Sequence, residues 1–260
     1  MSCNIRYSGA DDKENRWTNR KEICADIIRR QTPDIICFQE MWERQFIDLT
    51  GELPGYATYG IIEMSYGRNP TNCIFYRSDR FGVTSAAGYW LSETPHVPGS
   101  RSWGSDNVRL ANWIRLRDRI SGIEFRVVNT HIDHISQTAR ENQARLLCED
   151  AAGYPDEFPQ MLTGDMNSDA LNPAIGLLLK NGWSDTYEQV HGTATPGFTY
   201  HGFKGPAYEL GDTTGKDYVD KMDWIFVRGA VNVQSAAIIK DAEGGRYPSD
   251  HYFISADVEL

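Results

Sequence analysis

The feature that most constrains this fold is the interleaving of helix patterns with strand patterns, some of which pair as hairpins. Residues 108–117 alternate between apolar and polar side chains, Ser121-Gly122 offers a turn, and residues 124–129 form a second strand pattern. Because hairpins occur and no G-x-G-x-x-G follows a strand, a purely parallel dinucleotide-binding sheet is disfavoured. We therefore expect an α/β protein in which sheets pack together beneath helices.

Three predicted helices carry N-terminal signals. Asn19 with Glu22, and Thr138 with Glu141, resemble capping boxes, and Asn172 precedes a proline. The first helix is expected to end at Thr32-Pro33. Further strands are expected at residues 34–38, 158–163, 224–227, 231–239 and 253–258, with a short helix at 42–50.

The composition is that of an ordinary globular chain. Of 260 residues, 40% are hydrophobic and 24% are charged. No repeat or linker is visible, so we predict one domain over residues 1–260. Apolar runs such as residues 34–38 are far shorter than the roughly 20 residues of a membrane span, so none is expected. No signal segment is recognisable at the N-terminus, and the sequence leaves the compartment open.

The charge and the cysteines exclude two classes of site. Twenty-six basic against 36 acidic residues give a net charge of −10, so an extended basic surface for nucleic acid is not expected. The five cysteines are odd in number and contain no C-x-x-C, which argues against a zinc site or a disulfide framework. Most of them are expected in the core.

Two long segments stand apart from the regular patterns. Residues 92–107 are rich in Pro, Gly and Ser, and residues 188–220 are rich in Gly, Thr and aromatic side chains. Long loops inside a compact domain are often functional, so both are interpreted as pocket walls. Arg101 and Arg109 flank the first and are candidates to pair with a substrate phosphate.

Polar groups follow apolar strand patterns at four places. Glu40, His131, Asp165 and Asp250 each lie in such a position, and Asp223 opens a fifth strand. One such residue is usually a turn former that satisfies local backbone. Several together, with oxygen and imidazole groups and no thiol, indicate a site for a hard cation such as Mg²⁺, Mn²⁺ or Ca²⁺.

These residues lie within motifs that resemble the endonuclease/exonuclease/phosphatase superfamily. The motifs occur in order and are Asn4-Ile5-Arg6, Phe38-Gln39-Glu40, Asn129-Thr130-His131, Gly164-Asp165-Met166-Asn167, Met222-Asp223-Trp224 and Ser249-Asp250-His251. They span residues 4–251, and the segments 90–103 and 130–134 are similar to a bacterial branch of poorly defined substrate. The resemblance implies a four-layer α/β sandwich with two central mixed sheets, and metal-dependent phosphoester hydrolysis.

The resemblance also implies a metal side of the site. Glu40 looks like the principal ligand of Mg²⁺ or Mn²⁺. Asn4 lies beside it and orders the metal shell. Asp250 resembles a further carboxylate on the metal side.

The remaining motif residues resemble the groups that act on water and phosphate. Asp165 resembles the carboxylate that orients or deprotonates the attacking water, and Asn167 resembles a group that binds a phosphate oxygen and helps position that water. His251 resembles a phosphate donor that is steadied by Asp223, and His131 resembles a second phosphate-binding histidine. These groups suit a reaction that needs positioning and charge neutralisation.

The substrate stays open at this level. The first hypothesis is a phosphodiesterase or phosphatase that acts on a small, lipid or sugar phosphate. A nuclease acting on DNA or RNA is the alternative within the same chemistry, and a catalytically idle binding module with the same fold is the alternative outside it. The choice between monoester and diester, the number of metal ions and the oligomeric state remain open.

Overall fold

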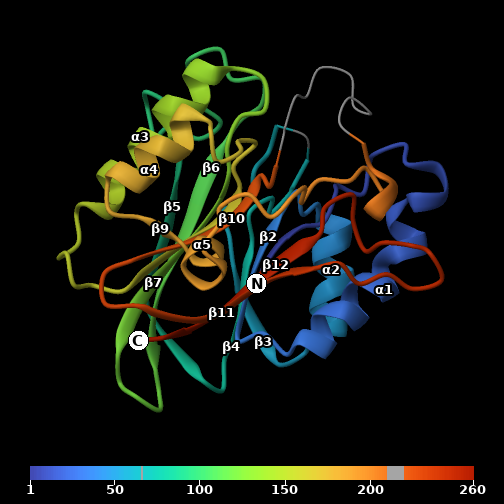
Figure 1. Ribbon diagram of the computed structural model, residues 1–260, viewed down its shortest axis with the longest axis horizontal. Coiled ribbons are helices and arrows are strands. Elements are labelled where there is room, and N and C mark those ends of the chain that lie inside the picture. Colours follow the sequence, from blue (N-terminus) through green and yellow to red (C-terminus); the bar gives the residue numbers. More distant parts are fainter. Residues whose placement is uncertain (66, 210–219) are drawn as a thin grey trace.

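The protein is a sandwich of two sheets with helices on the outer faces (Figure 1). The computed structural model describes residues 1–65, 67–209 and 220–260. Each sheet has six strands. The predicted four-layer α/β sandwich with two central mixed sheets is confirmed. Among the described residues, no helix is both long enough and apolar enough to cross a bilayer.

The first sheet combines strands from both ends of the chain, in the order β11-β12-β1-β2-β4-β3. Its strands are β1 (Ser2–Asn4), β2 (Ile35–Gln39), β3 (Tyr56–Tyr59), β4 (Ile74–Arg77), β11 (Asn232–Ile239) and β12 (Phe253–Glu259). Strands β1 and β2 are parallel, and the other neighbours are antiparallel. Helices α1 (Trp17–Gln31) and α2 (Glu43–Glu52) pack on this sheet.

The second sheet is built from one continuous part of the chain, in the order β5-β6-β7-β8-β10-β9. Its strands are β5 (Phe81–Trp90), β6 (Leu110–Asp118), β7 (Glu124–His131), β8 (Gln160–Asp165), β9 (Ser184–Asp185) and β10 (Asp223–Arg228). Strands β7 and β8 are parallel. The helices of this half are α3 (Gln137–Ala151), α4 (Pro173–Lys180) and α5 (Thr186–His191). Two short 3-10 turns, η1 (Lys13–Asn15) and η2 (Gly205–Ala207), complete the described elements.

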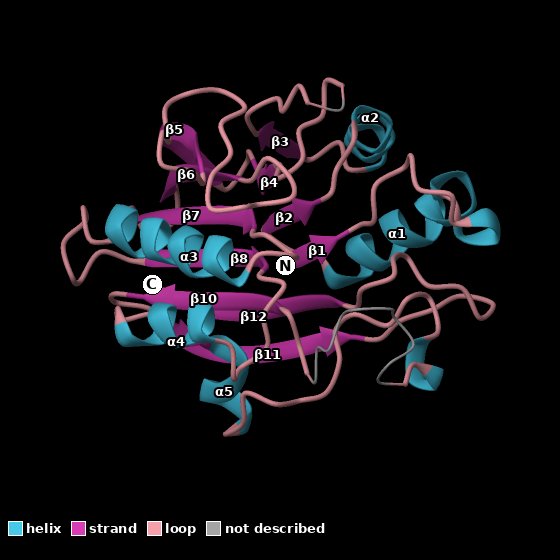
Figure 2. Ribbon diagram, turned by 90° about the horizontal axis from the view of Figure 1, so that it is seen from above, coloured by secondary structure: helices cyan, strands magenta, loops and turns pink. Residues whose placement is uncertain are grey.

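Three clusters of buried apolar side chains hold these layers together. One joins α1 and α2 to the first sheet, and another joins α3 and α4 to the second sheet. A third lies between the sheets, where Ile74 of β4 packs with Ile114 and Val127 of the second sheet. Figure 2 shows α1 and α2 well separated from α3 and α4, with the strands between them. The active-site strands are therefore buried on both faces, which makes their ends rigid supports.

The helix starts differ in part from the predicted caps. Helix α1 begins at Trp17, before the Asn19–Glu22 box, and its N-cap makes no side-chain hydrogen bond. Ser136, rather than Thr138, caps α3, because its hydroxyl accepts from the Ala139 backbone N–H. Both predicted boxes are therefore wrong. The Asn172 cap of α4 is confirmed, since its side chain accepts from the Ala174 N–H.

Several strands had no clear sequence signal. The hairpin of β6 and β7 is confirmed, but β3, β4 and β5 went unrecognised. Strand β5 runs from Phe81 to Trp90 with mostly half-buried small residues, so it lacks clear alternation. In the predicted loop 188–220, α5 reaches to His191, and residues 210–219 lie outside the described part.

The strand directions bring the motif residues to one end of the sandwich. Strands β1 and β2 are parallel, so Asn4 and Glu40 leave the first sheet on the same side. Strand β12 is antiparallel to β1, so the residues just before it come to that side too. In the second sheet, β7 and β8 end there and the antiparallel β10 begins there. Register places His131 beside Asp165, and Asp165 beside Asp223.

Candidate active site

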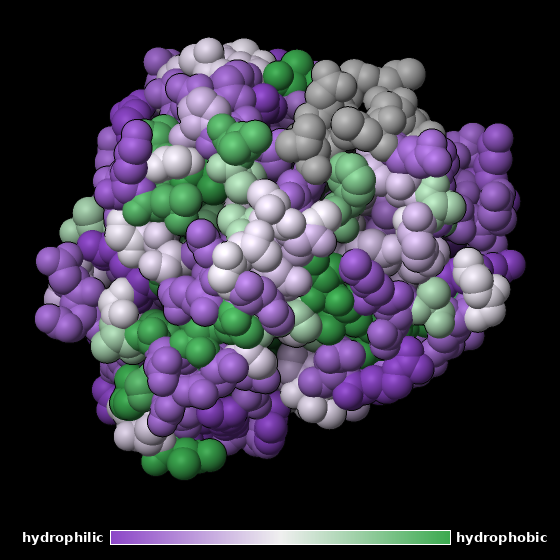
Figure 3. Space-filling view, in the orientation of Figure 1, coloured by the Kyte–Doolittle hydropathy of each residue, from purple (hydrophilic) through white to green (hydrophobic). Residues whose placement is uncertain are grey.

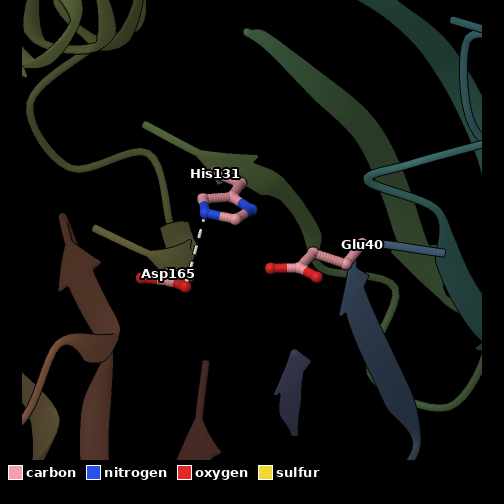
Figure 4. A group of neighbouring side chains, drawn as sticks. All are labelled: Glu40, His131 and Asp165. Atoms are coloured by element: carbon pink, nitrogen blue, oxygen red, sulfur yellow. Dashed lines mark ion pairs between the residues drawn. The ribbon is translucent and has the colours of Figure 1, made fainter. Parts of the chain in front are cut away.

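Three side chains from three neighbouring strand ends converge at the centre of the site. Figure 4 shows Glu40, His131 and Asp165 pointing toward a common space from β2, β7 and β8. One ligand atom from each lies within 4.8 Å of the others. His131 Nε2 and Asp165 Oδ2 lie 3.4 Å apart. Two carboxylates and an imidazole within this radius could share a divalent cation.

Asn4 lies beneath this group and is fully buried. Its Nδ2 donates to Glu40 Oε1 at 3.1 Å and to Asp165 Oδ2 at 2.9 Å, while its Oδ1 accepts from the Arg6 backbone N–H. Asn4 therefore ties the two carboxylates together, one from each sheet. The amide would have to turn over before its oxygen could ligate a cation.

Asp250 lines the same pocket and lies near positively charged side chains. Its Oδ2 is 3.7 Å from Arg6 Nε, and Ser249 Oγ donates to its Oδ1 at 3.1 Å. Burial alone would raise the pKa of Asp250, but the charges of His251, Arg6 and Arg20 lower it below the usual range. Asp250 is therefore held as a carboxylate, which is the form that binds a metal.

His251 forms a buried pair with Asp223. His251 Nδ1 lies 2.8 Å from Asp223 Oδ2, and its Nε2 lies 3.8 Å from Asp165 Oδ2. Burial lowers the pKa of His251, but the charge and hydrogen bond of Asp223, with help from Asp165 and Asp250, raise it to about 10. The imidazole is therefore charged at neutral pH, and Asp223 fixes which nitrogen is left for a ligand.

Asp165 has the opposite electrostatic character from Asp250. Burial raises the pKa of Asp165, and so does the neighbouring charge of Asp223; together they outweigh His251 and the hydrogen bonds from Asn167 and Asn4. A carboxyl group with a raised pKa is a better proton acceptor than an ordinary one. Its Oδ1 accepts from the Asn167 backbone N–H at 2.9 Å, which fixes its orientation.

Asn167 couples Asp165 to the histidine of the neighbouring strand. Its Nδ2 lies 2.8 Å from His131 Nε2 and donates to the Ile132 carbonyl at 3.1 Å. Asn167 has φ +42°, and Glu40 has φ +60°. Positive φ is uncommon outside glycine and tends to cluster at functional sites. Two of the site residues are thus held in a costly backbone conformation by their surroundings.

Gly164 allows strands β7 and β8 to approach closely just before Asp165. It has φ +153°, and a Cβ added there would lie 2.1 Å from the Thr130 carbonyl oxygen. No other residue can occupy this position without moving the strand. The glycine of the Gly164-Asp165 motif therefore sets where the carboxylate lies.

The donor chemistry of the site fits a hard divalent cation. Carboxylates of Glu40, Asp165 and Asp250 face one pocket with imidazoles and an amide nearby. The five cysteines are all buried and none of them lines the pocket, so the set contains no thiolate. Oxygen-rich sets of this kind suit Mg²⁺ or Mn²⁺ better than a soft metal.

The pocket above these groups has a volume of about 630 Å³. The predicted residues that line it are Glu40, Arg109, His131, Asp165, Asn167, Asp250 and His251. Asn4 and Asp223 lie just behind the lining and contact it through the hydrogen bonds described above. Arg101 is not among the lining residues: it is exposed and donates to the Asp106 carbonyl. The structure thus brings Arg109, and not Arg101, to the site.

Sequence reasoning missed several lining residues. They are Tyr7, Trp42, Glu63 and Asn72, whereas Arg6 belongs to a recognised motif and Tyr200 to a predicted wall. Tyr7 and Trp42 each come within three residues of a motif, and that proximity was the available signal. Glu63 and Asn72 lie in the β3–β4 connection, where no strand had been recognised. Of the two predicted walls, the first contributes at its end through Asn107, and the second contributes Tyr200.

Asp133 and His134 follow His131 and have different roles. Asp133 is buried, and its carboxylate accepts from the backbone N–H groups of Ile135, Ser136 and Asp106. It is therefore a turn residue. His134 lines the pocket, and its Nδ1 lies 3.2 Å from Arg109 Nη2.

One face of the outer surface is shown in Figure 3. Hydrophilic side chains dominate there, and the apolar residues form small separate patches. On β6, Arg115 and Arg117 both pair with Glu124, which offsets one of their two positive charges.

Comparisons with known proteins show the family of the chain. Residues 1–251 match the family model described as "Endonuclease/Exonuclease/phosphatase family". An endonuclease/exonuclease/phosphatase structure from Bacteroides vulgatus is 30% identical, with TM-score 0.86, over 100% of this chain and 97% of that one. A mannosyl-6-phosphatase structure from Bacteroides thetaiotaomicron is 26% identical, with TM-score 0.86, over 100% and 98% of the two chains.

A curated relative gives a more distant match. Nocturnin from Drosophila melanogaster is 28% identical over 177 residues, which are 63% of this chain and 26% of that protein. The chain thus spans about a quarter of this relative's length. Taken with the family match over residues 1–251, the fold and the convergent carboxylates and histidines, these likenesses place the chain in the endonuclease/exonuclease/phosphatase family of phosphoester hydrolases.

Proposed function

We propose that the protein is a divalent-metal-dependent phosphatase or phosphodiesterase that acts on a small phosphoester. The observation that carries this proposal is the convergence of Glu40, Asp165 and Asp250 with His131 and His251 at the floor of a pocket of about 630 Å³. Pockets of this size enclose small ligands. The family comparison supplies the class of reaction, and the pocket argues for the scale of the substrate.

The roles proposed for the residues follow from their environments. Asp165 orients the attacking water and accepts its proton, because its raised pKa favours proton uptake. His251 donates from Nε2 to a phosphate oxygen, since its Nδ1 is engaged by Asp223. Asn167 and His131 supply further contacts to the phosphate. These donors neutralise charge that builds up in the transition state.

Glu40 and Asp250 are proposed to hold Mg²⁺ or Mn²⁺, with Asn4 keeping Glu40 in place. A divalent cation there would polarise the phosphoryl oxygen and stabilise the leaving oxygen. Two observations support this assignment. The pKa of Asp250 is lowered, which favours its carboxylate form. Glu40 Oε2 accepts a hydrogen bond from the Tyr7 backbone N–H at 3.1 Å, which fixes its position.

A small substrate is favoured over a nucleic acid. The net charge of −10 repels a polyanion, and Arg115 and Arg117 are occupied by Glu124. The similar mannosyl-6-phosphatase adds support from a protein that the chain matches over its full length. A nuclease remains the alternative, since the relative from Candida albicans is named an exoribonuclease subunit.

The test is a panel of phosphomonoesters, bis-p-nitrophenyl phosphate, single-stranded RNA and plasmid DNA, each assayed with Mg²⁺, Mn²⁺ or excess chelator. We expect hydrolysis of a small ester that the chelator abolishes. Efficient degradation of plasmid or RNA, with slow turnover of every small ester, would promote the nuclease alternative.

Two variants connect this activity to the site. Asp165→Asn keeps the shape of a side chain at the end of β8, so it should keep a melting temperature near wild type and lose most activity. His251→Asn should also lose most activity, and its melting temperature should fall, because Asp223 is left buried without its partner. If either variant is inactive only because it unfolds, its catalytic role loses support. Asp156→Asn is the matched control, because Asp156 is 95% exposed and pairs with Arg228 on the surface.

A further inference from the structure

The pocket is larger than a phosphate group requires. At about 30 Å³ for each water-sized group, 630 Å³ holds on the order of twenty such groups. A phosphate accounts for about five heavy atoms of that space. The remaining volume is available to the alcohol part of the ester. The side chains that line this volume therefore indicate the chemical nature of the alcohol.

Part of this lining is a fixed aromatic wall made of Tyr7 and Trp42. The two ring centroids lie 4.9 Å apart with an interplanar angle of 36°, and both residues are partly exposed in the pocket. Gly9 packs against the Trp42 ring so closely that an added Cβ would lie 2.3 Å from it. Trp42 thus contacts both Gly9 and Tyr7, and it lies two residues after Glu40.

The buried side chain of Gln45 joins the two chain segments that carry Tyr7 and Trp42. Its Oε1 accepts from the Ser8 N–H at 3.0 Å and from the Trp42 N–H at 3.1 Å. Its Nε2 donates to the Arg6 carbonyl at 2.8 Å. The aromatic wall is therefore preorganised, and a ring that stacks on it would not have to order it first.

The other part of the lining away from the metal side is polar. Arg109 and His134 lie in contact, with 3.2 Å between Nη2 and Nδ1. Glu63 is 5% exposed, and its carboxylate accepts from the Ser65 N–H at 2.9 Å, which fixes it at the pocket. Planar charged groups of this kind form directed hydrogen bonds with hydroxyl groups.

An aromatic face together with planar polar groups matches the surface of a sugar. A pyranose has a ring face of C–H groups that can lie on an aromatic ring, and a rim of hydroxyls that needs hydrogen-bond partners. A lipid chain would require an apolar lining, which the charged groups Glu63 and Arg109 deny. Resting on the proposed function, we infer that the alcohol is a hexose whose ring lies on Trp42 and whose hydroxyls reach Glu63, Arg109 and His134.

The inference is tested with two esters that share a primary phosphate and differ in the ring. Hexose 6-phosphate has the ring, and glycerol 3-phosphate lacks it. Trp42→Ala should lower kcat/KM for the hexose ester by about 10- to 100-fold, mainly through KM, and should change the glycerol ester by less than about 3-fold. Trp42→Phe should restore most of the loss. Trp113→Ala, which removes a tryptophan outside the pocket lining, should leave the ratio of the two esters unchanged.

Calorimetry makes the test independent of turnover. In the Asp165→Asn background with Mg²⁺ present, hexose 6-phosphate should bind, and adding Trp42→Ala should weaken that binding by a similar factor. Binding without turnover in the wild type would uphold the sugar site and reject the proposed function. Equal losses for both esters, no binding of the hexose ester, or a nucleoside 5′-monophosphate preferred over it would overturn the sugar assignment.

Discussion

The Asp223→Asn variant gives the sharpest test of the electrostatics of this site. Asp223 Oδ2 lies 2.8 Å from His251 Nδ1, and both side chains are buried. Asparagine keeps the shape of the side chain but removes the charge. Burial already lowers the pKa of His251, so without that charge the pKa must fall from about 10.

The expected loss can be worked from the cost of breaking a buried pair. Removing one partner of such a pair costs about 3–5 kcal/mol. Each 1.36 kcal/mol added to the activation free energy lowers the rate tenfold. If the whole cost falls on the transition state, kcat should fall by roughly 10²- to 10⁴-fold. The loss should appear at neutral pH without a comparable change in KM.

The assay is kcat against pH from about 6 to 9.5 with saturating Mg²⁺. In the wild type His251 should stay charged until the pH approaches about 10. The fall of kcat on the alkaline side of the pH profile (the basic limb) should therefore begin only at the end of this range. In the variant that limb should move to lower pH. Asp156→Asn, at the surface, should follow the wild type.

Thermal stability gives a second reading with a defined sign. The pKa of His251 is raised from 6.5, so its protonation stabilises the fold fully below about pH 6.5 and the effect is lost as the pH rises toward about 10. The melting temperature of Asp223→Asn should therefore lie furthest below wild type near pH 6.5 and approach it near pH 9.5. An unchanged basic limb together with a pH-independent gap in melting temperature would refute this account of the pair.

Three further outcomes are expected. Glu40→Gln should lower kcat by roughly 10²- to 10⁴-fold and weaken Mg²⁺ binding in calorimetry, because it keeps the shape and loses the charge; unchanged turnover would remove Glu40 from the site. Gly164→Ala should lower stability by about 2–3 kcal/mol, seen as a fall of several degrees in melting temperature, since its Cβ would meet the Thr130 carbonyl. Gly176→Ala in α4, with nothing within 4 Å of the new Cβ, is its control and should not destabilise. The plot of log kcat/KM against log salt should have a slope of magnitude below about 2, whereas plasmid degradation with a slope steeper than about −4 would indicate several phosphate contacts.

The carboxylates at the bottom of the pocket could be predicted from the sequence, whereas most of the side chains that form its sides could not. Glu40 and Asp165 follow or end strands as predicted, whereas Asp250 precedes β12 and does not follow a strand. Strand direction then brings all three carboxylates to one end of the sandwich. The walls depend on loops, whose course is set by tertiary contacts such as those of Gln45. No local pattern records that a glutamine on α2 holds Trp42 against Tyr7.

Two errors have the same physical origin. Arg101 lies within the Pro-, Gly- and Ser-rich loop 92–107 and Arg109 follows it. Only Arg109 directly precedes β6, whose pairing with β5 fixes its place, and it is Arg109 that lines the pocket. The capping-box pattern of Thr138 and Glu141 predicts that Thr138 caps α3. Ser136 competes for the Ala139 N–H from two residues earlier, and it also donates to the Trp103 carbonyl, a contact that no local rule includes.

The way the first sheet is assembled has a consequence for biosynthesis. Strand β1 lies between β2 and β12, whereas every strand of the second sheet comes from the stretch between them in the chain. A ribosome that adds about 5–20 residues per second makes Asp250 roughly 10–40 s after Glu40. Through that interval β1 has an unpaired edge, and Glu40 lacks the carboxylate of Asp250. The nascent chain therefore cannot complete the candidate site until the segment leading into β12 has emerged, and until then the open edge of β1 is exposed to non-native pairing.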